Sequence, residues 1–218
     1  MKFMESGCEF VKSFLDQTDI DYILNHALKC EQSSMTECNF EEWTQGIMKV
    51  NDAYLYPKLV KYTTKMEQLT GLKLIPKYSF WRMSLKGNRL PYHIDRPPCE
   101  ISATINIGVS GEDIWPFFAD HNKKYKFLMS SGDAVIYKGS EFIHWREPLA
   151  SDWNIQWCIH YTRADGPLAD ISPAAEWNEI DKKDIRFAEI LNKSDGLFKI
   201  AKELEAEYNG KTKTKISV

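Results

Sequence analysis

The sequence lacks the features of a membrane protein or of a disulfide-rich secreted protein. Its 218 residues include five cysteines, an odd number, and no two of them form a C-x-x-C pair. Such cysteines are typical of reduced thiols in a cytosolic compartment. No apolar run is long enough to span a bilayer, and the first residues, Met-Lys-Phe-Met-Glu-Ser-Gly, contain no apolar core of a secretory signal. We therefore expect a cytoplasmic protein without a membrane partner.

A large excess of charge of either sign is also absent. The chain has 28 Lys and Arg against 31 Asp and Glu, which gives a formal net charge of -3. This balance provides no electrostatic reason to expect a nucleic-acid partner. The basic cluster formed by Lys211, Lys213 and Lys215 is interpreted as a frayed, solvated tail.

Apolar residues, in contrast, are plentiful. The hydrophobic fraction is 43% and the aromatic fraction 13%, which favours a packed globule over a disordered chain. The length fits a single domain spanning residues 1–218. Residues 1–75 are predicted to be a helical support, residues 76–163 a jelly-roll core, and residues 164–218 C-terminal helices with a basic tail.

Two helices are predicted within the first 75 residues. Apolar residues recur with helical spacing over residues 20–28, behind Thr18 and Asp19, which can cap a helix start. A second helix is expected from Pro57 to Thr70, with Gly71 as its stop. Residues 31–50 show no clear period and are interpreted as a loop.

From about residue 72 the hydrophobic period changes to two, which is typical of β-strands. Turns rich in Gly, Asn and Ser separate short segments, and this pattern predicts an antiparallel double-stranded β-helix, or jelly roll. The fold class is therefore α+β with a mainly β core and flanking helices. In one predicted strand, Ser102, Thr104 and Asn106 form a polar face that looks either at water or into a cofactor pocket. The predicted strands cover residues 78–85, 100–107, 113–118, 132–138, 142–146 and 153–161.

The C-terminal part returns to a helical pattern. An apolar stripe from Ile185 to Leu204 is interrupted near Asp195-Gly196. It predicts one or two helices packed against the outside of the sheet.

His93, Asp95 and His144 are candidate metal ligands. The spacing of two places His93 and Asp95 on the same side of a strand, and His144 follows a predicted turn and strand. Two imidazoles and one carboxylate can occupy one face of an octahedral metal and leave three positions open. This arrangement suits an Fe(II) that also holds an organic acid and O2. The alternative for the His-x-Asp triplet is a surface turn with a solvated aspartate.

These residues resemble those of the Fe(II)/2-oxoglutarate-dependent dioxygenases. The order His-x-Asp, about fifty residues, then His within a double-stranded β-helix is similar to that family. Local sequences resemble its prolyl-hydroxylase-like branch over residues 76–163. The resemblance implies Fe(II) held by the catalytic residues His93, Asp95 and His144, with 2-oxoglutarate as co-substrate, O2 as oxidant and ascorbate as a supporting reductant. The sequences are Arg82-x-x-x-x-Gly87, His93-Ile-Asp-Arg-Pro, Gly132-Asp-Ala-Val-Ile-Tyr and His144-Trp-Arg-Glu-Pro.

The resemblance also implies a basic residue that binds the distal carboxylate of 2-oxoglutarate. Family members usually place it about ten positions after the second histidine, where this chain has the uncharged Asn154. Gln156, two positions further on, is uncharged as well. Arg146 is the first substitute, because its guanidinium can hold a carboxylate bidentately, although an ion pair with a surface acid such as Glu147 is the alternative. Arg82 is the second candidate for cofactor binding.

Other side chains have two interpretations each. His160 shares the parity of Gln156 on its strand and either faces the pocket or is a hydrogen-bonded core residue. Several aromatic residues either wall the pocket or pack in the core. These aromatic residues are Trp81, Tyr92, Phe118, Tyr137 and Trp145.

The function implied by the resemblance is hydroxylation of a C–H bond with release of succinate and CO2. A small-molecule or an amino-acid or peptidyl substrate is compatible with it, and the oligomeric state is left open. The alternative is a cupin-like metal- or ligand-binding jelly roll without oxygenase activity, which the missing basic residue favours. A zinc hydrolase is less attractive because the chain has no helical His motif.

Overall fold

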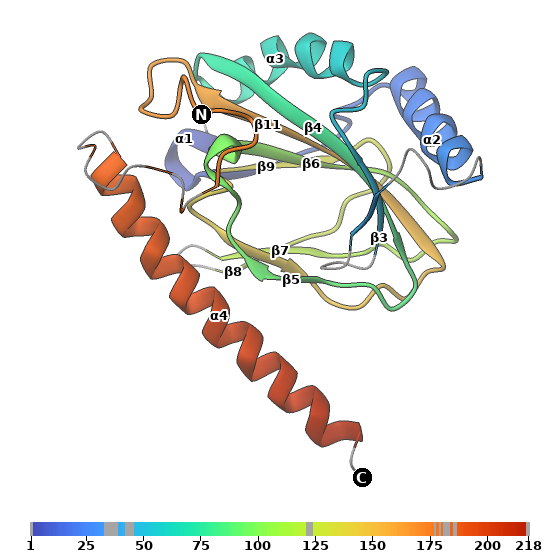
Figure 1. Cartoon of the computed structure of the whole chain (residues 1–218). Coiled ribbons are helices and arrows are strands. Elements are labelled where there is room, and N and C mark those ends of the chain that lie inside the picture. Colours follow the sequence, from blue (N-terminus) through green and yellow to red (C-terminus); the bar gives the residue numbers. More distant parts are fainter. Residues whose placement is uncertain are drawn as a thin grey trace.

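The computed structural model describes residues 2–32, 39–41, 46–120, 124–176, 178, 180, 184 and 187–216. Two antiparallel β-sheets face each other, and helices lie outside them (Figure 1). This arrangement confirms the predicted α+β fold with a double-stranded β-helix core. The larger sheet contains, in order, β1 (Cys8–Val11), β9 (Ala134–Tyr137), β6 (Ile101–Val109), β11 (Trp153–Arg163), β4 (Leu74–Leu85), β3 (Gly46–Val50) and β2 (Asn39–Glu41). The smaller sheet contains β5 (Leu90–His93), β10 (Ile143–Arg146), β7 (Phe117–Asp120) and β8 (Lys124–Phe127).

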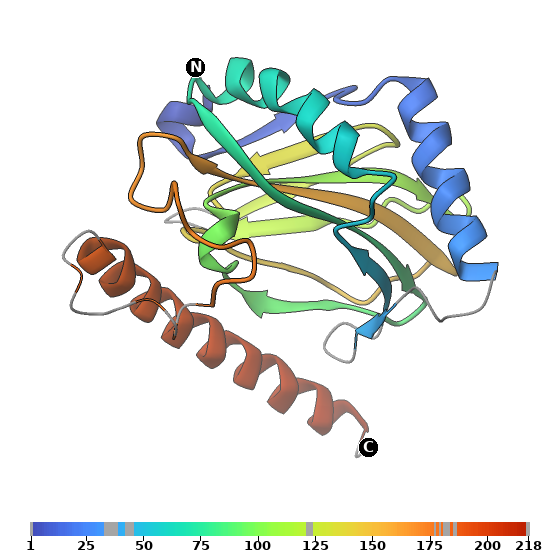
Figure 2. The same cartoon turned by 45° about the horizontal axis from the view of Figure 1, so that its top comes forward.

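The main hydrophobic core lies between the larger sheet and the N-terminal helices. The apolar faces of the sheet strands, with Ile105 and Trp157 fully buried, pack against α2 (Gln17–Gln32) and α3 (Tyr56–Thr70). Figures 1 and 2 show both helices on the outer side of this sheet. The main core uses the helix-facing side of the large sheet, so the opposite strand faces look into the interior between the sheets, where polar side chains lie beside a second apolar cluster that includes Phe117 and Val135. Ser102, Thr104 and Asn106 therefore point inward rather than toward bulk water, and each is buried.

Both predicted N-terminal helices are confirmed. Pro57 lies in the first turn of α3, where its missing N–H is not needed. Gly71 ends the helix in the left-handed region at φ 75°, and its N–H donates to the carbonyl of Glu67. A short helix, α1 (Lys2–Ser6), precedes both.

The interpretation of residues 31–50 as a loop is wrong where the structure describes them. Residues 39–41 form β2 and residues 46–50 form β3, which pairs with β4. The first 75 residues are therefore not only helical, because β1, which pairs with β9, also belongs to the larger sheet. These strands of three to five residues are too short to show a period. β1 and β3 pair with the distant strands β9 and β4, whereas β2 pairs with the neighbouring β3. Residues 33–38 and 42–45 lie outside the described residues.

One predicted strand is displaced and another was missed. The strand expected over residues 113–118 is β7, which begins at Phe117, directly after Pro116. Proline has no N–H to donate to a sheet, so the strand begins after it. The four-residue β8, which alternates exposed and half-buried residues at the sheet edge, was not predicted. The 3-10 turn η1 (Pro97–Cys99) lies between β5 and β6.

The C-terminal helix α4 (Ala188–Ile216) runs continuously through Asp195-Gly196, so of the two possibilities that the sequence left open, one helix or two, the structure has one. A glycine inside a helix costs about 1 kcal/mol relative to alanine. Packing on both sides of Gly196 offsets this cost: Leu191 contacts one cluster and Ala201 contacts Ile94 and Ile143 in another. The helix continues to Ile216, so the basic segment is helical rather than frayed. Ile185, the expected start of the stripe, lies outside the described residues.

Among the helices that the structure describes, none has the length and apolarity required to cross a bilayer.

Candidate metal centre

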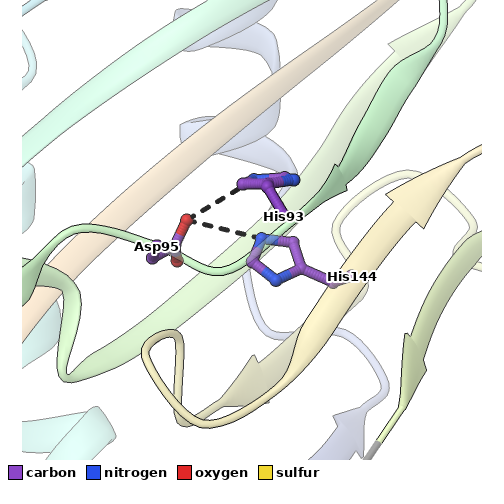
Figure 3. A group of neighbouring side chains, drawn as sticks. All are labelled: His93, Asp95 and His144. Carbon is purple, nitrogen blue, oxygen red and sulfur yellow. Dashed lines mark ion pairs between the residues drawn. The ribbon is translucent and has the colours of Figure 1, made fainter. Parts of the chain in front are cut away.

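His93, Asp95 and His144 meet in the interior between the two sheets (Figure 3). His93 ends β5 and lies opposite His144 on the neighbouring strand β10, while Asp95 follows two residues after His93. Asp95 Oδ1 is 3.7 Å from His93 Nε2 and 3.4 Å from His144 Nε2. Neighbouring ligands at about 2.1 Å from a divalent metal lie about 3 Å apart, so a small contraction would bring all three onto one ion.

Backbone carbonyls orient both imidazoles. His93 Nδ1 is 2.8 Å from the carbonyl of Pro91, and His144 Nδ1 is 2.9 Å from that of Phe142. A carbonyl only accepts, so each Nδ1 carries the proton and each Nε2 presents a lone pair toward Asp95. Each histidine uses the carbonyl two residues before it, and the local strand therefore sets the ligand geometry.

His93 and Asp95 have the protonation states that a metal requires. Burial, together with the nearby His144, lowers the pKa of His93 to about 3, so the His93 imidazole is neutral at physiological pH. Burial alone would raise the pKa of Asp95, but His144 and the other imidazoles hold it well below its usual range. A neutral imidazole and an ionised carboxylate bind a divalent metal without first losing a proton.

A cavity of about 560 Å³ adjoins this centre and lies between the sheets. Its size falls in the range typical of small-molecule sites, about 300–1,000 Å³. All three predicted cofactor-binding residues line it together with the metal-site residues, whereas Asn154 does not. The Asn154 amide instead donates to Asn106 Oδ1 at 2.9 Å and to the carbonyl of Gly108 at 3.2 Å. The three cofactor-binding predictions are Arg82, Arg146 and Gln156.

Arg146 is fully buried at one end of the cavity, with 1% of its surface exposed. Nη1 donates to the carbonyl of Trp115 at 2.7 Å, and the guanidinium lies over the Trp115 and Phe117 rings. With its amide oxygen turned toward the guanidinium, Gln156 accepts from Arg146 Nε at 3.1 Å. The alternative of an ion pair with Glu147 is wrong: within the described part of the chain, no carboxylate pairs with Arg146. Burial lowers the pKa of Arg146 to about 9, which leaves it cationic at neutral pH.

Strand parity separates the aromatic residues that line the cavity from those that do not. Tyr137 lines it, as one interpretation allowed, but Trp81 packs in the helix-facing core. Tyr92 and Phe118 stack on Trp145 with ring centroids 4.6 and 5.3 Å apart, on the opposite face of the small sheet. Tyr78 and Phe80 are among the lining residues that sequence reasoning missed. Their parity with Arg82 on β4 was the signal that could have found them.

Neither a family model nor a curated protein sequence matches the chain. Solved structures do match. A prolyl-4-hydroxylase from Pseudomonas putida has a TM-score of 0.56 and 16% identity, over 74% of this chain and 96% of that one. A 2OG-Fe(II) oxygenase family oxidoreductase from Burkholderia pseudomallei has a TM-score of 0.60 and 13% identity, over 74% and 88%. The viral collagen prolyl hydroxylase of Paramecium Bursaria Chlorella virus-1 has a TM-score of 0.55 and 14% identity, over 72% and 96%.

The structural neighbours are thus 2OG-Fe(II) oxygenases, several of them prolyl hydroxylases. At these identities the similarity shows the fold, and the chain has the fold of this class. Its possible His-Asp-His metal triad agrees with the class.

Proposed function

We propose that this protein is an Fe(II)/2-oxoglutarate-dependent dioxygenase that hydroxylates a C–H bond of a small molecule, an amino acid or a peptide, with release of succinate and CO2. The observation that carries the proposal is one cavity that holds both a two-histidine, one-carboxylate triad and a buried arginine with no acidic partner among the described residues. His93, Asp95 and His144 would hold the iron, and Arg146 would bind the distal carboxylate of 2-oxoglutarate.

The environment of Arg146 supports an anion site. A buried cation is costly unless an anion accompanies it. Within the described ranges, the hydrogen-bond acceptors of Arg146 are the neutral Trp115 carbonyl and Gln156 amide oxygen, and aromatic rings lie beside its guanidinium. Guanidinium groups bind carboxylates in a bidentate fashion. A dicarboxylic acid would therefore supply the missing charge, with Arg82 as a second cation lining the same cavity.

The spacing along β10 fits a five-carbon diacid. His144 and Arg146 are two residues apart on this strand and face the same side, which separates their Cα atoms by about 6–7 Å. An acid anchored at Arg146 would extend its 2-oxo acid end toward the triad. Two solved neighbours support this choice of co-substrate: the viral hydroxylase is a 2OG complex, and HygX of Streptomyces hygroscopicus has nickel and 2-oxoglutarate bound.

The iron would supply O2 activation coupled to oxidative decarboxylation of the 2-oxo acid. The protein residues contribute orientation and enclosure. Arg146 and Gln156 would fix the acid, and the sheets would shield the reaction from bulk water. Beyond the triad, the cavity continues to Tyr78, Phe80 and Phe198, and this part is left for the substrate.

A cupin-like binding protein without oxygenase activity is the second candidate. The favouring observation is Asn154, which stands where a basic residue is usual and whose amide is engaged by Asn106 and Gly108. Such a protein would bind metal at the triad but would not turn over 2-oxoglutarate.

Decarboxylation of labelled 2-oxoglutarate tests the proposed function. The purified protein, incubated in air with Fe(II), ascorbate and the labelled acid, is expected to release CO2. The variant His93→Ala should fall to background because it lacks one metal ligand. The control His26→Gln, on α2 and outside the cavity, should keep the wild-type rate. Equal CO2 release by wild type and His93→Ala would reject oxygenase activity and favour the cupin-like alternative.

A further inference from the structure

A buried serine contacts the second carboxylate oxygen of Asp95, and a buried histidine contacts that serine. The proposed function uses neither residue. Ser102 Oγ lies 3.1 Å from Asp95 Oδ2 and 2.9 Å from His160 Nδ1. Ser102 is fully buried and His160 is 2% exposed. The residues come from neighbouring strands, β6 and β11, where Ser102 and His160 are paired in register. The larger sheet therefore reaches the metal centre through this pair.

The direction of the hydrogen bonds follows from the number of protons. A serine hydroxyl has one hydrogen to donate, and three acceptors surround it: Asp95 Oδ2, His160 Nδ1 and the carbonyl of Cys99 at 3.2 Å. A bond to an ionised carboxylate is stronger than one to a neutral acceptor, so the hydroxyl donates to Asp95. His160 Nδ1 then donates to Ser102 Oγ.

The other nitrogen of His160 does not explain why a histidine is present. Nε2 is buried and has no hydrogen-bond partner among the described residues. The ring stacks on Tyr78 and Phe80, with centroids 4.5 and 5.5 Å away, and a phenyl ring would serve this packing equally well. The polar contribution of His160 is therefore its Nδ1–H bond to Ser102.

We propose that Ser102 and His160 are positioning residues that keep Asp95 as a one-oxygen metal ligand. The hydrogen bond from Ser102 engages Asp95 Oδ2 and leaves Oδ1, the oxygen facing His93 and His144, to the ion. The backbone of Gly139 holds Asp95 from the other side: its carbonyl accepts from Asp95 N–H at 3.0 Å, and a Cβ there would collide with Oδ2. The inference rests on the proposed metal site.

A competing arrangement must be distinguished. Ligand atoms of Asp95, Cys99 and His160 also lie within 4.8 Å of one another, so these residues form a second group that could hold a metal. In that arrangement His160 would be a ligand rather than a positioning residue. A thiolate ligand to Co(II) produces an intense charge-transfer absorption, which nitrogen and oxygen ligands do not produce.

The test is an anaerobic titration of the apo-protein with Co(II) alone, followed by visible absorption, for wild type and three variants. Ser102→Ala should weaken Co(II) affinity about 10–100-fold and change the ligand-field spectrum, as loss of an outer-shell partner does. His160→Phe should weaken it about fivefold, the loss of one neutral hydrogen bond. Ser79→Ala, the same chemical change at a buried site outside the cavity, should leave affinity unchanged. Thermal melts of the apo-proteins verify folding.

Each outcome has a defined meaning. If Ser102→Ala keeps the wild-type Co(II) affinity and spectrum, the positioning role of Ser102 and His160 is overturned. The proposed metal site is not overturned by that result, because the wild type still binds metal. A thiolate charge-transfer band in the wild type would also overturn the positioning role, since Cys99 and His160 would then be ligands. A wild type that binds no Co(II) would overturn the proposed function together with this inference. If Ser102→Ala does not fold, the affinity of His160→Phe decides in the same way.

Discussion

At the level of single residues, the candidate metal ligands were easier to predict from the sequence than the residue proposed to bind the co-substrate. The triad depends on local features that a sequence displays: a spacing of two, and a second histidine on an alternating strand. Arg146 depends on the surroundings of its guanidinium, which are provided by Trp115 and Gln156 from other parts of the chain. Its position could be predicted from parity, but its lack of an acidic partner could not. Ser102 gave no signal beyond the polar face of its strand.

Substitution of Arg146 should affect the co-substrate and spare the metal. In Arg146→Met the affinity of the Fe(II) protein for 2-oxoglutarate should fall roughly 100-fold, since losing one partner of a buried charge pair costs about 2–5 kcal/mol. Fe(II) affinity should remain, because Arg146 is not a ligand. Thermal shift induced by 2-oxoglutarate measures the first effect. Arg82→Met is the matched comparison, and a larger loss there would move the anion site to β4.

Individual elements are joined by polar contacts that the sequence pattern does not reveal. Asp19 on α2 accepts hydrogen bonds from three residues of α3: Lys58, Lys61 at 2.7 Å and Tyr62 at 2.5 Å. Periodicity predicted both helices, and it assigned Asp19 only a capping role. The aspartate instead fixes one helix against the other.

This junction should make stability depend on acid pH. Burial alone would raise the pKa of Asp19, but the hydrogen bonds from α3 lower it from 3.8 to about 2. A depressed pKa contributes stability above the unfolded value and loses it as pH falls from about 4 to about 2. Asp19→Asn should therefore cost roughly 2 kcal/mol at pH 7, with the difference from wild type shrinking across that window. Urea denaturation at several pH values measures this, and a constant difference would contradict it.

Helix α4 offers a second prediction at this scale. The sequence left one helix or two open around Gly196, and the glycine lies inside a single helix. Among the described residues, no atom beyond the helix's own backbone lies within 4 Å of a Cβ built there. Gly196→Ala should raise the free energy of unfolding by about 0.5–1 kcal/mol, because alanine is the better helix former. Thermal or urea denaturation would detect the gain. Destabilisation would show that residues around position 196 are not helical in solution.

The whole molecule places its main hydrophobic core outside the two-sheet sandwich, where helices cover the apolar face of the large sheet (Figure 2). The space between the sheets holds a smaller apolar cluster and a cavity with polar residues in its lining. Strand alternation allowed the sequence to predict a jelly roll with flanking helices. It could not decide which face of each strand was the core face, because that depends on which helices pack there. The short strands β1 and β3 escaped prediction for a related reason: they pair with strands that are distant in the sequence.

The proposed function requires one cavity to hold both Fe(II) and 2-oxoglutarate. Anaerobic titration of 2-oxoglutarate into the Fe(II) protein tests it most directly, because bidentate binding of a 2-oxo acid to Fe(II) produces a weak visible charge-transfer band. The band should appear and saturate in the wild type, require much more 2-oxoglutarate in Arg146→Met, and be absent in His93→Ala. Absence of the band from wild-type protein that has bound Fe(II) would contradict the proposal that 2-oxoglutarate binds the iron in this cavity.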